Sequence, residues 1–182
     1  MRVSRKQVEE NKQTILTAAG RLFRERGFDA VTVTDIMKSA GLTHGGFYGY
    51  FKSKDDLIAQ TLAELKIESD AANNGVIAQI ERYLSPKHRD NFASGCPLAA
   101  LAAETIRQSE PARDEMSARL QQQIAQLSEA MDDRDAQASR RAAIGSWSAM
   151  VGALILARMT ADSAFSDEIL AETAAWLAEK QR

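Results

Sequence analysis

Apolar residues recur every three or four positions along almost the whole chain, which is the spacing of one face of an α-helix. The first such stretch has this spacing at Val8, Ile15, Ala19, Leu22 and Phe23. Alternating patterns typical of strands are scarce, and only three prolines interrupt the 182 residues. The sequence therefore predicts an all-α fold of about nine helices.

Capping residues and glycines mark where these helices begin and end. Thr32 with Asp35, and Ser53 with Asp56, have the spacing of capping boxes, and Gly27 stands where the first helix would end. The expected helices cover about residues 6–26, 33–40, 43–49, 54–65, 76–84, 97–108, 110–131, 135–160 and 167–179, with Ser166 as the cap of the last.

The composition is typical of a folded globular protein, with 45% apolar and 26% charged residues. No run approaches the ~18 apolar residues that a membrane helix needs, and no apolar core follows the basic N-terminus as in a secretion signal. The single cysteine, Cys96, excludes an intramolecular disulfide and fits a reducing cytosol. Two histidines and this one cysteine cannot easily build a structural zinc site. From these features we expect no metal, no cofactor, no membrane and a cytoplasmic location.

Charge is divided unevenly along the chain. Residues 1–54 contain ten Lys and Arg against five acids, a net of +5, whereas residues 55–182 contain 13 basic and 20 acidic residues, a net of −7. A basic end on an acidic body is typical of a small DNA-reading head joined to a domain with another task. The alternative is a solvated basic face on a helical protein.

Residues 32–54 have the form of a helix-turn-helix, since two short expected helices are separated by Gly41. In the second helix Phe47 and Phe51 lie four apart and can face a core. The other side must be exposed to enter a major groove. It carries small or hydrogen-bonding groups and no carboxylate: Thr43, His44, Gly46 and Tyr48.

This short helix contains three glycines, and each destabilises a helix by about 1 kcal/mol relative to alanine. Glycine lets a backbone approach a partner closely, which favours contact with DNA. Lys52 and Lys54 follow at once, and Lys54 begins the next helix, where the helix dipole also attracts phosphate. The alternative is a glycine-rich loop that joins two core helices.

Several short strings occur here in a fixed order: Thr34-Asp35-Ile36, Ala40-Gly41-Leu42-Thr43, Phe47-Tyr48, Tyr50-Phe51 and Lys54-Asp55-Asp56-Leu57. With them, residues 12–60 resemble the DNA-binding head of the TetR family of bacterial transcriptional regulators. The body resembles that family in length and helix order, and the string from Gly95 to Glu104 resembles one subgroup.

The resemblance implies a helix-turn-helix domain over residues 1–52 and a ligand-binding and dimerisation domain over residues 53–182. It also implies roles for single residues. Phosphates would be bound by Thr32 or Thr34, Tyr48 and Lys54. Base edges would lie at or beside Thr43, His44, Gly46 and Tyr50. The chain departs from the family at Gly46 and Gly49, where larger residues are common, so few direct base contacts are expected.

The last two expected helices carry more apolar surface than a terminal pair needs, which favours a dimer interface. In the family these helices form a four-helix bundle with those of a second subunit. The candidate interface residues are Val151, Leu154, Ile155, Ile169, Thr173 and Trp176. The alternative is that they close the core of one chain.

An effector site is expected among helices that surround the cavity in relatives. Its candidate residues are Phe92, Cys96, Leu101, Met116, Leu120, Trp147 and Met150. Since no charged cluster occurs among them, we expect a small hydrophobic or aromatic molecule. Apolar stripes at helical spacing are also typical of plain core.

The sequence thus predicts a DNA-binding transcriptional regulator, a ligand-released repressor that binds double-stranded DNA at a palindromic operator as a homodimer. One alternative uses Cys96, at an expected helix N-terminus, as a sensor of oxidants or electrophiles. Another is a helical interaction module that does not bind DNA. An enzyme is not expected, because no nucleophile motif or phosphate loop occurs and His88 is read as part of a solvated loop.

Overall fold

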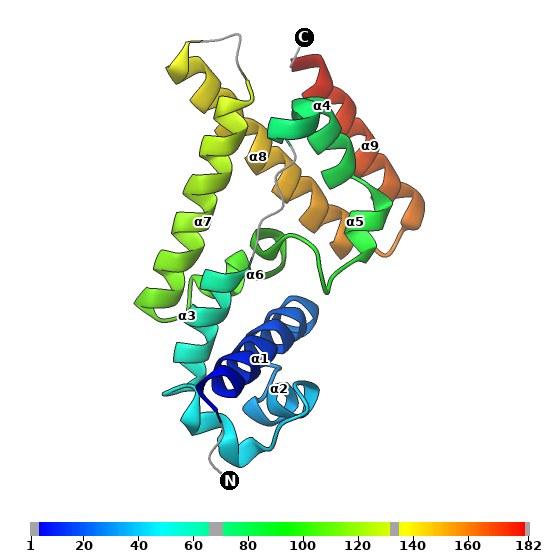
Figure 1. Ribbon diagram of the computed structural model, residues 1–182. Coiled ribbons are helices and arrows are strands. Elements are labelled where there is room, and N and C mark those ends of the chain that lie inside the picture. Colours follow the sequence, from blue (N-terminus) through cyan, green and yellow to red (C-terminus); the bar gives the residue numbers. More distant parts are fainter. Residues whose placement is uncertain (1–3, 66–70, 132–134, 181–182) are drawn as a thin grey trace. The chain divides into compact units, whose positions relative to one another are not determined.

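The computed structural model describes residues 4–65, 71–131 and 135–180, and these form ten helices and no strand. The all-α prediction is therefore confirmed (Figure 1). The helices are α1 (Arg5–Arg26), α2 (Val33–Ser39), η1 (His44–Gly49), α3 (Lys54–Glu64), α4 (Ala71–Tyr83), α5 (Pro86–Asp90), α6 (Pro97–Thr105), α7 (Glu110–Glu129), α8 (Ala136–Met159) and α9 (Ser163–Lys180).

Helix caps explain two of the differences between the structure and the sequence prediction. The tenth helix, α5, begins where the sequence suggested only an ending, since the Ser85 hydroxyl accepts a hydrogen bond from the His88 N–H and Pro86 fits the first turn. The last helix begins four residues earlier than expected. Its first turn is capped by Asp162, and Ser166 is buried with its hydroxyl donating to the Ala157 carbonyl, so the prediction that Ser166 caps α9 is wrong.

The chain divides into two compact units, here called unit 1 and unit 2. Unit 1 comprises residues 1–66 and 100–117, and unit 2 comprises residues 67–99 and 118–182. Helix α3 therefore groups with the head, and the chain crosses between the units within α6 and α7. The functional boundary expected after residue 52 remains a prediction.

Unit 1 is built around α1, which packs against both α2 and α3. Phe23 of α1 meets Phe28 edge to face, with ring centroids 5.1 Å apart, and both rings are buried. Ile36 of α2 and Leu57 of α3 are also fully buried. Burial of such side chains stabilises the unit by about 1.5–3 kcal/mol each, so α1 holds the short helices that could not persist alone.

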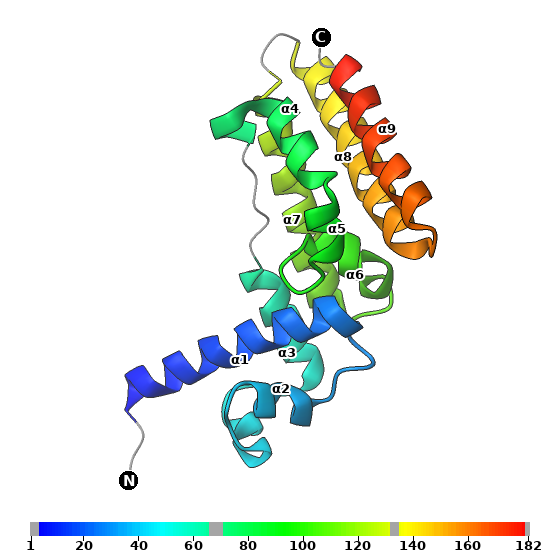
Figure 2. The ribbon, with the colours of Figure 1, turned by 90° about the vertical axis from the view of Figure 1, so that its right-hand side faces the viewer.

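Unit 2 is built around the antiparallel pair α8 and α9, which lie side by side in both views (Figures 1 and 2). Leu154 of α8 and Leu170 and Leu177 of α9 are buried. Helix α4 packs against α9, and it changes direction at Gly75, whose φ is 80°.

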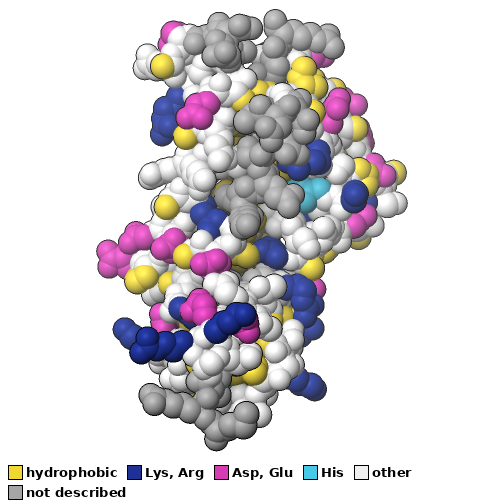
Figure 3. Space-filling view, viewed as in Figure 1, with side chains coloured by type: hydrophobic (Ala, Val, Ile, Leu, Met, Phe, Trp, Pro, Cys, Tyr) yellow, Lys and Arg dark blue, Asp and Glu magenta, His cyan; other side chains and the backbone are white. Residues whose placement is uncertain are grey.

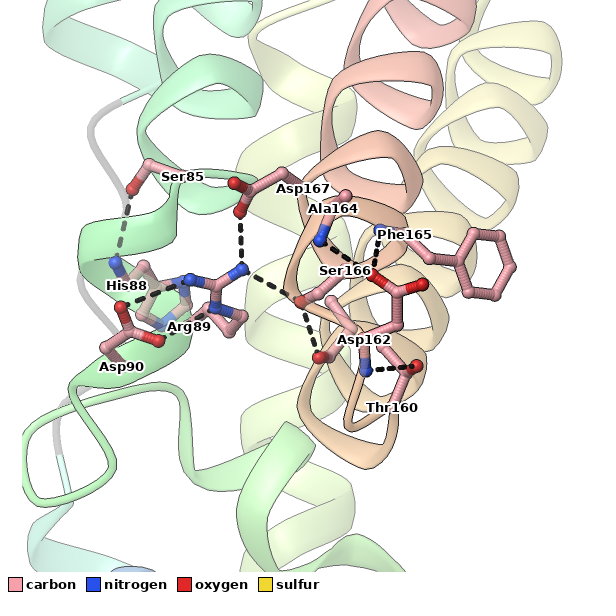
Figure 4. A network of polar contacts seen from close by, with 11 residues as sticks. Ser85, His88, Arg89, Asp90, Thr160, Asp162, Ala164, Phe165, Ser166 and Asp167 are labelled. Atoms are coloured by element: carbon pink, nitrogen blue, oxygen red, sulfur yellow. Dashed lines mark hydrogen bonds and ion pairs between the residues drawn. The ribbon is translucent and has the colours of Figure 1, made fainter.

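The start of α9 is fastened to α5 by one arginine (Figure 4). The Arg89 guanidinium donates to Asp90 at 2.7 Å, to Asp167 at 2.6 Å and to the Ser166 hydroxyl at 2.8 Å. These bonds raise the pKa of Arg89 and hold the pKa of the Asp90 carboxyl below its usual range. Arg158 of α8 donates in turn to the Arg89 carbonyl at 3.0 Å, so three helices meet at this network.

Helix α8 is long and apolar enough to cross a membrane by length and composition alone. Core helices of water-soluble proteins satisfy the same test, and Met150 and Leu154 on one side of α8 are buried inside unit 2. The other side of α8 is exposed and apolar, at Ile144, Ile155 and Met159, and this stripe needs an explanation of its own.

Candidate nucleic-acid interface

The turn of the helix-turn-helix lies at Gly41, whose φ of 71° is a left-handed conformation that favours glycine. Its N–H donates to the Lys38 carbonyl, and the next N–H, of Leu42, donates to the Met37 carbonyl. Both bonds close the C-terminus of α2 in the manner of a Schellman turn. The turn therefore connects α2 directly to η1.

The second helix of the motif is a short 3₁₀-helix rather than an α-helix. It is anchored by Phe47 and Phe51, which are 1% and 2% exposed and stack with ring centroids 5.6 Å apart. Tyr48, between them, is 75% exposed. The two rings therefore hold one side of η1 in the core and present the other side to solvent, as the sequence predicted.

The glycines of η1 are not required by the protein's own packing. A Cβ atom built on Gly45 or Gly49 meets nothing within 4 Å, and neither residue has a positive φ. Alanine would fit at both positions and would favour the helix. Packing within the chain therefore does not explain why these residues are glycines. This supports close approach of the backbone to a partner outside the chain.

Most of the predicted base-reading residues lie on the exposed side of η1. Thr43 and His44 are exposed, Gly46 is half-buried, and Thr43 makes no capping bond with its side chain. Tyr50 is also half-buried, and its hydroxyl accepts a hydrogen bond from the Asn11 amide of α1 at 2.9 Å. Tyr50 is thus tied to α1 but retains its hydroxyl proton for a further partner.

The two threonines predicted to bind phosphate differ in their surroundings. Thr32 caps α2 in a complete capping box, in which its hydroxyl accepts from the Asp35 N–H at 3.1 Å and its own N–H donates to the Asp35 carboxylate at 3.0 Å. The Thr32 hydroxyl also donates to that carboxylate. The hydrogen bonds from Thr32 hold the pKa of Asp35 below its usual range. Thr34 is exposed on α2. Of the two, Thr34 is the better placed for a phosphate.

Lys54 is placed differently from expectation. Its ammonium donates to the Phe28 carbonyl at 2.6 Å, in a part-buried contact, instead of extending into solvent. The Phe28 N–H donates in turn to the Glu104 carboxylate at 2.6 Å. Gly27 has a φ of 81°, a left-handed conformation that favours glycine, and a Cβ there would also clash with that carboxylate. Phe28 is therefore clamped from both sides, by α3 and by α6.

The surface of unit 1 combines basic and acidic side chains. Figure 3 shows Lys and Arg side chains over α1 and α2. Some are paired, as in the contact of Arg21 with Glu25 at 3.0 Å. Lys52 is exposed directly after η1, and its N–H donates to Asp56 at 2.8 Å, which holds the pKa of that carboxyl below its usual range. Ser53 caps α3 as predicted, although Asp56 reaches back to Lys52 rather than to Ser53.

The predicted effector residues fall into both units. Leu101 and Met116 are buried in unit 1. In unit 2, Trp147 and Met150 are buried, whereas Leu120 is 37% exposed. Phe92, the remaining apolar candidate, is 45% exposed in unit 2 and lies under the Arg158 guanidinium, 4.6 Å from its ring centroid.

Cys96 is buried, and burial raises the pKa of its thiol despite its position before α6. Its N–H donates to Nε2 of His88 at 3.1 Å, while Nδ1 of His88 lies 2.7 Å from the Tyr83 carbonyl. Nδ1 must therefore carry the proton, which makes His88 a neutral, part-buried link between two segments. The prediction of a solvated loop at His88 is wrong, because His88 lies in α5 and its ring nitrogens bond to the Tyr83 carbonyl and the Cys96 N–H.

The predicted dimer residues are exposed to different degrees. Ile155 and Trp176 are 43% and 51% exposed, and Val151, Ile169 and Thr173 are half-buried. Leu154 is fully buried inside unit 2 and cannot reach a second subunit, so its proposed place in the interface is wrong. The helical spacing is correct, but Leu154 lies one position away from the exposed stripe. Four further exposed apolar residues were not singled out: Ile144, Leu156, Met159 and Phe165.

Other positioning residues gave no local signal. Asn11 bonds to Tyr50, which is 39 positions away in the sequence, and Glu104 bonds to Phe28, which is 76 positions away. Glu104 ends the string that resembles a subgroup of the family, and this was the one indication that it matters. Among the described residues no group of three or more His, Cys, Asp or Glu side chains could hold a metal ion.

A basic head with an exposed helix-turn-helix, joined to a helical second unit, defines a DNA-binding transcription regulator. Residues 15–61 match the model for bacterial regulatory proteins of the tetR family, and residues 71–170 match the model for the C-terminal domain of LmrA/YxaF-like transcriptional regulators. The chain belongs to the TetR family of transcriptional regulators. Such proteins are regulators rather than enzymes, as the sequence predicted.

Individual relatives agree with this assignment. The transcriptional regulator AcrR of Shigella flexneri is 34% identical over 77 residues, which cover 38% of this chain and 36% of that protein. The repressor NemR of Escherichia coli K12 is 29% identical over 137 residues, 68% of each chain. The reduced form of E. coli NemR has a similar fold, with a TM-score of 0.72 and 23% identity over 93% of this chain and 96% of that one.

The clamp on Phe28 predicts different effects for two neighbouring lysines. Lys54→Met should lower the free energy of unfolding by about 1.5–3 kcal/mol, because it removes a hydrogen bond from a charged donor to a part-buried carbonyl. The matched change at exposed Lys52 should alter it by less than about 0.5 kcal/mol. Urea denaturation of both variants measures the difference. Equal stability would show that the contact of Lys54 with Phe28 contributes nothing.

Proposed function

We propose that the chain is a ligand-released repressor that binds a palindromic operator on double-stranded DNA as a homodimer in the bacterial cytoplasm. The observation that carries the DNA-binding part is the exposed side of η1, with Tyr48 extended into solvent and open space where a Cβ of Gly45 or Gly49 would lie. Side chains and backbone can both approach a groove there. His44 and Tyr50 lie on the same short helix or directly after it and would contact base edges.

Phosphate binding follows from the charges around this helix. Lys52 is exposed, Thr34 lies on α2, and the Tyr48 hydroxyl extends from η1. Such contacts fix the register of a protein on the duplex but carry no base information. Lys54 supports them by holding the loop between α1 and α2, and its remaining N–H groups can still face a phosphate.

The homodimer rests on the unpaired apolar stripe of α8 and α9. Ile155, Met159, Phe165 and Trp176 are all at least 43% exposed on these two helices. Exposed apolar side chains that recur along adjacent helices are typical of a subunit contact. A second copy of the same pair would cover the stripe by two-fold symmetry, and two heads would then read two half-sites.

Release by a reversible ligand is favoured over thiol chemistry at Cys96. The thiol is 7% exposed and its pKa is raised by burial, so little thiolate forms near neutral pH. A reactive sensor cysteine needs the opposite, an accessible thiol with a lowered pKa. An effector would act by binding the conformation that does not fit DNA better than the one that does.

Selection from a pool of random DNA duplexes tests the proposal. The purified protein should enrich an inverted repeat whose half-sites lie about one helical turn, ~34–36 Å, apart. Recovery of a single half-site would contradict the dimer, and no enrichment even at low salt would contradict operator binding. A Tyr48→Ala variant in the same selection should lose affinity for all duplexes alike.

Charge placed on the stripe should break the dimer. Ile155→Glu and Trp176→Glu should shift the protein to monomer in analytical ultracentrifugation, because each would bury an unpaired carboxylate at the contact. Helical circular dichroism should stay unchanged, since both positions are exposed in the single chain. Ala171→Glu, on the opposite exposed side of α9, is the control and should remain dimeric. An unaltered dimer in all three variants would place the interface elsewhere.

A further inference from the structure

The hydroxyl of Tyr50 is held by a short series of hydrogen bonds that begins in the first turn of α1. Ser4 caps this helix, and its hydroxyl accepts a hydrogen bond from the Gln7 N–H at 3.1 Å. The Gln7 side-chain amide donates to the Asn11 side-chain oxygen at 3.0 Å, one turn further along. The Asn11 amide nitrogen then donates to the Tyr50 hydroxyl at 2.9 Å. Two uncharged side chains thus connect the start of α1 to the residue directly after η1.

The direction of these bonds determines what the Tyr50 hydroxyl can still do. Because the Asn11 oxygen accepts from Gln7, the amide nitrogen of Asn11 faces Tyr50, and an amide nitrogen donates but does not accept. The phenolic oxygen is therefore the acceptor of this bond, and its own proton must be donated elsewhere. Within residues 4–65, 71–131 and 135–180 nothing accepts that proton. A hydroxyl in this state suits an acceptor outside the chain.

The ring of Tyr50 is held beside the exposed side of η1. Tyr50 is half-buried, and a Cβ built on Gly46 would lie 3.9 Å from both Cε2 of Tyr50 and Oγ1 of Thr43. The ring therefore lies next to the residues predicted to read base edges. Lys12, the next residue of α1, places its ammonium 6.0 Å from the centroid of the Phe51 ring. Two successive side chains of α1 thus contact the two residues that follow η1.

Tyr48 provides a comparison within the same short segment. Its side chain is 75% exposed and packs edge to face against Phe47, with no hydrogen bond from its hydroxyl to a described residue. Such a side chain loses rotational freedom when it binds a partner, which weakens binding. The Tyr50 hydroxyl has lost much of that freedom already, because Asn11 and its neighbours hold it. Removing Asn11 should therefore cost affinity for the partner of Tyr50.

We propose that Asn11 is a positioning residue for DNA binding. Its amide directs the proton of the Tyr50 hydroxyl toward a hydrogen-bond acceptor of the duplex, which is a phosphate oxygen or an acceptor on a base edge. This rests on the proposed function, because it requires that the exposed side of η1 meets DNA. It also assigns a role to a residue of α1 that lies outside the helix-turn-helix and acts on DNA only through Tyr50.

A double-mutant cycle on the selected operator tests this role. Tyr50→Phe keeps the ring but removes the hydroxyl, and it should weaken binding about tenfold. Asn11→Leu leaves the hydroxyl in place but unheld, and it should weaken binding about threefold. Because Asn11 acts through that hydroxyl, Asn11→Leu should cause no further loss in a Tyr50→Phe background. Equal losses in the two backgrounds, or no loss in the wild-type background, would overturn the proposal.

Two further variants separate positioning from a general effect on α1. Gln7→Leu removes the donor that orients the Asn11 amide, at an exposed position of the first turn. It should weaken binding less than Asn11→Leu does, and this loss should also disappear in a Tyr50→Phe background. Gln13→Leu, exposed on the other side of α1, is the matched control and should bind like the wild type. A loss with Gln13→Leu as large as that with Asn11→Leu would contradict a specific role of Asn11.

Selection from random duplexes with Asn11→Leu identifies the acceptor. An acceptor on a base edge predicts a relaxed preference at one base pair of each half-site, compared with the wild type. A phosphate oxygen predicts an equal loss on every duplex and an unchanged preference. Both results agree with the proposal, because both partners accept the proton of Tyr50.

Failure of this proposal is separable from failure of the proposed function. A wild-type protein that binds the operator, with Asn11→Leu and Tyr50→Phe binding equally well, would remain a DNA-binding regulator in which Asn11 positions nothing. A wild-type protein that binds no duplex even at low salt would overturn both proposals.

Discussion

The stack of Phe47 on Phe51 is the contact on which the rest of the head depends. A six-residue 3₁₀-helix with three glycines has too few hydrogen bonds and too little propensity to persist alone. The two buried rings, with centroids 5.6 Å apart, stabilise η1 by packing in the core, and they fix its rotation about its axis. Tyr48 is exposed for the same reason, because it lies between two residues that face inward.

A second constraint holds the loop between α1 and α2. Phe28 is buried, its carbonyl accepts from Lys54, and its N–H donates to Glu104. The first partner begins α3 and the second lies near the end of α6, a helix whose first residues belong to unit 2. Glu104 lies in the part of α6 that belongs to unit 1, and Phe28 and Lys54 belong to the same unit, so the clamp on Phe28 is formed within that unit.

Local signals explain which features could be predicted from the sequence. The Thr32 capping box, the turn at Gly41 and the inward Phe47 and Phe51 depend on residues within four positions of one another, and the structure confirms them. Contacts between distant residues could not be predicted, since nothing local marks them. The bond from Asn11 to Tyr50 and the clamp on Phe28 are of this kind. The misplacement of Leu154 has another cause: helical spacing shows which residues share a face, but not whether that face meets its own core or a partner.

The central claim is that the exposed side of η1 binds DNA. Amide hydrogen exchange of the full chain, measured with and without the selected operator duplex, tests it most directly. The account predicts slower exchange in peptides that cover residues 43–50, with a duplex of scrambled sequence giving a weaker effect at the same salt concentration. Unchanged exchange in residues 43–50, with protection appearing elsewhere in the chain, would contradict it.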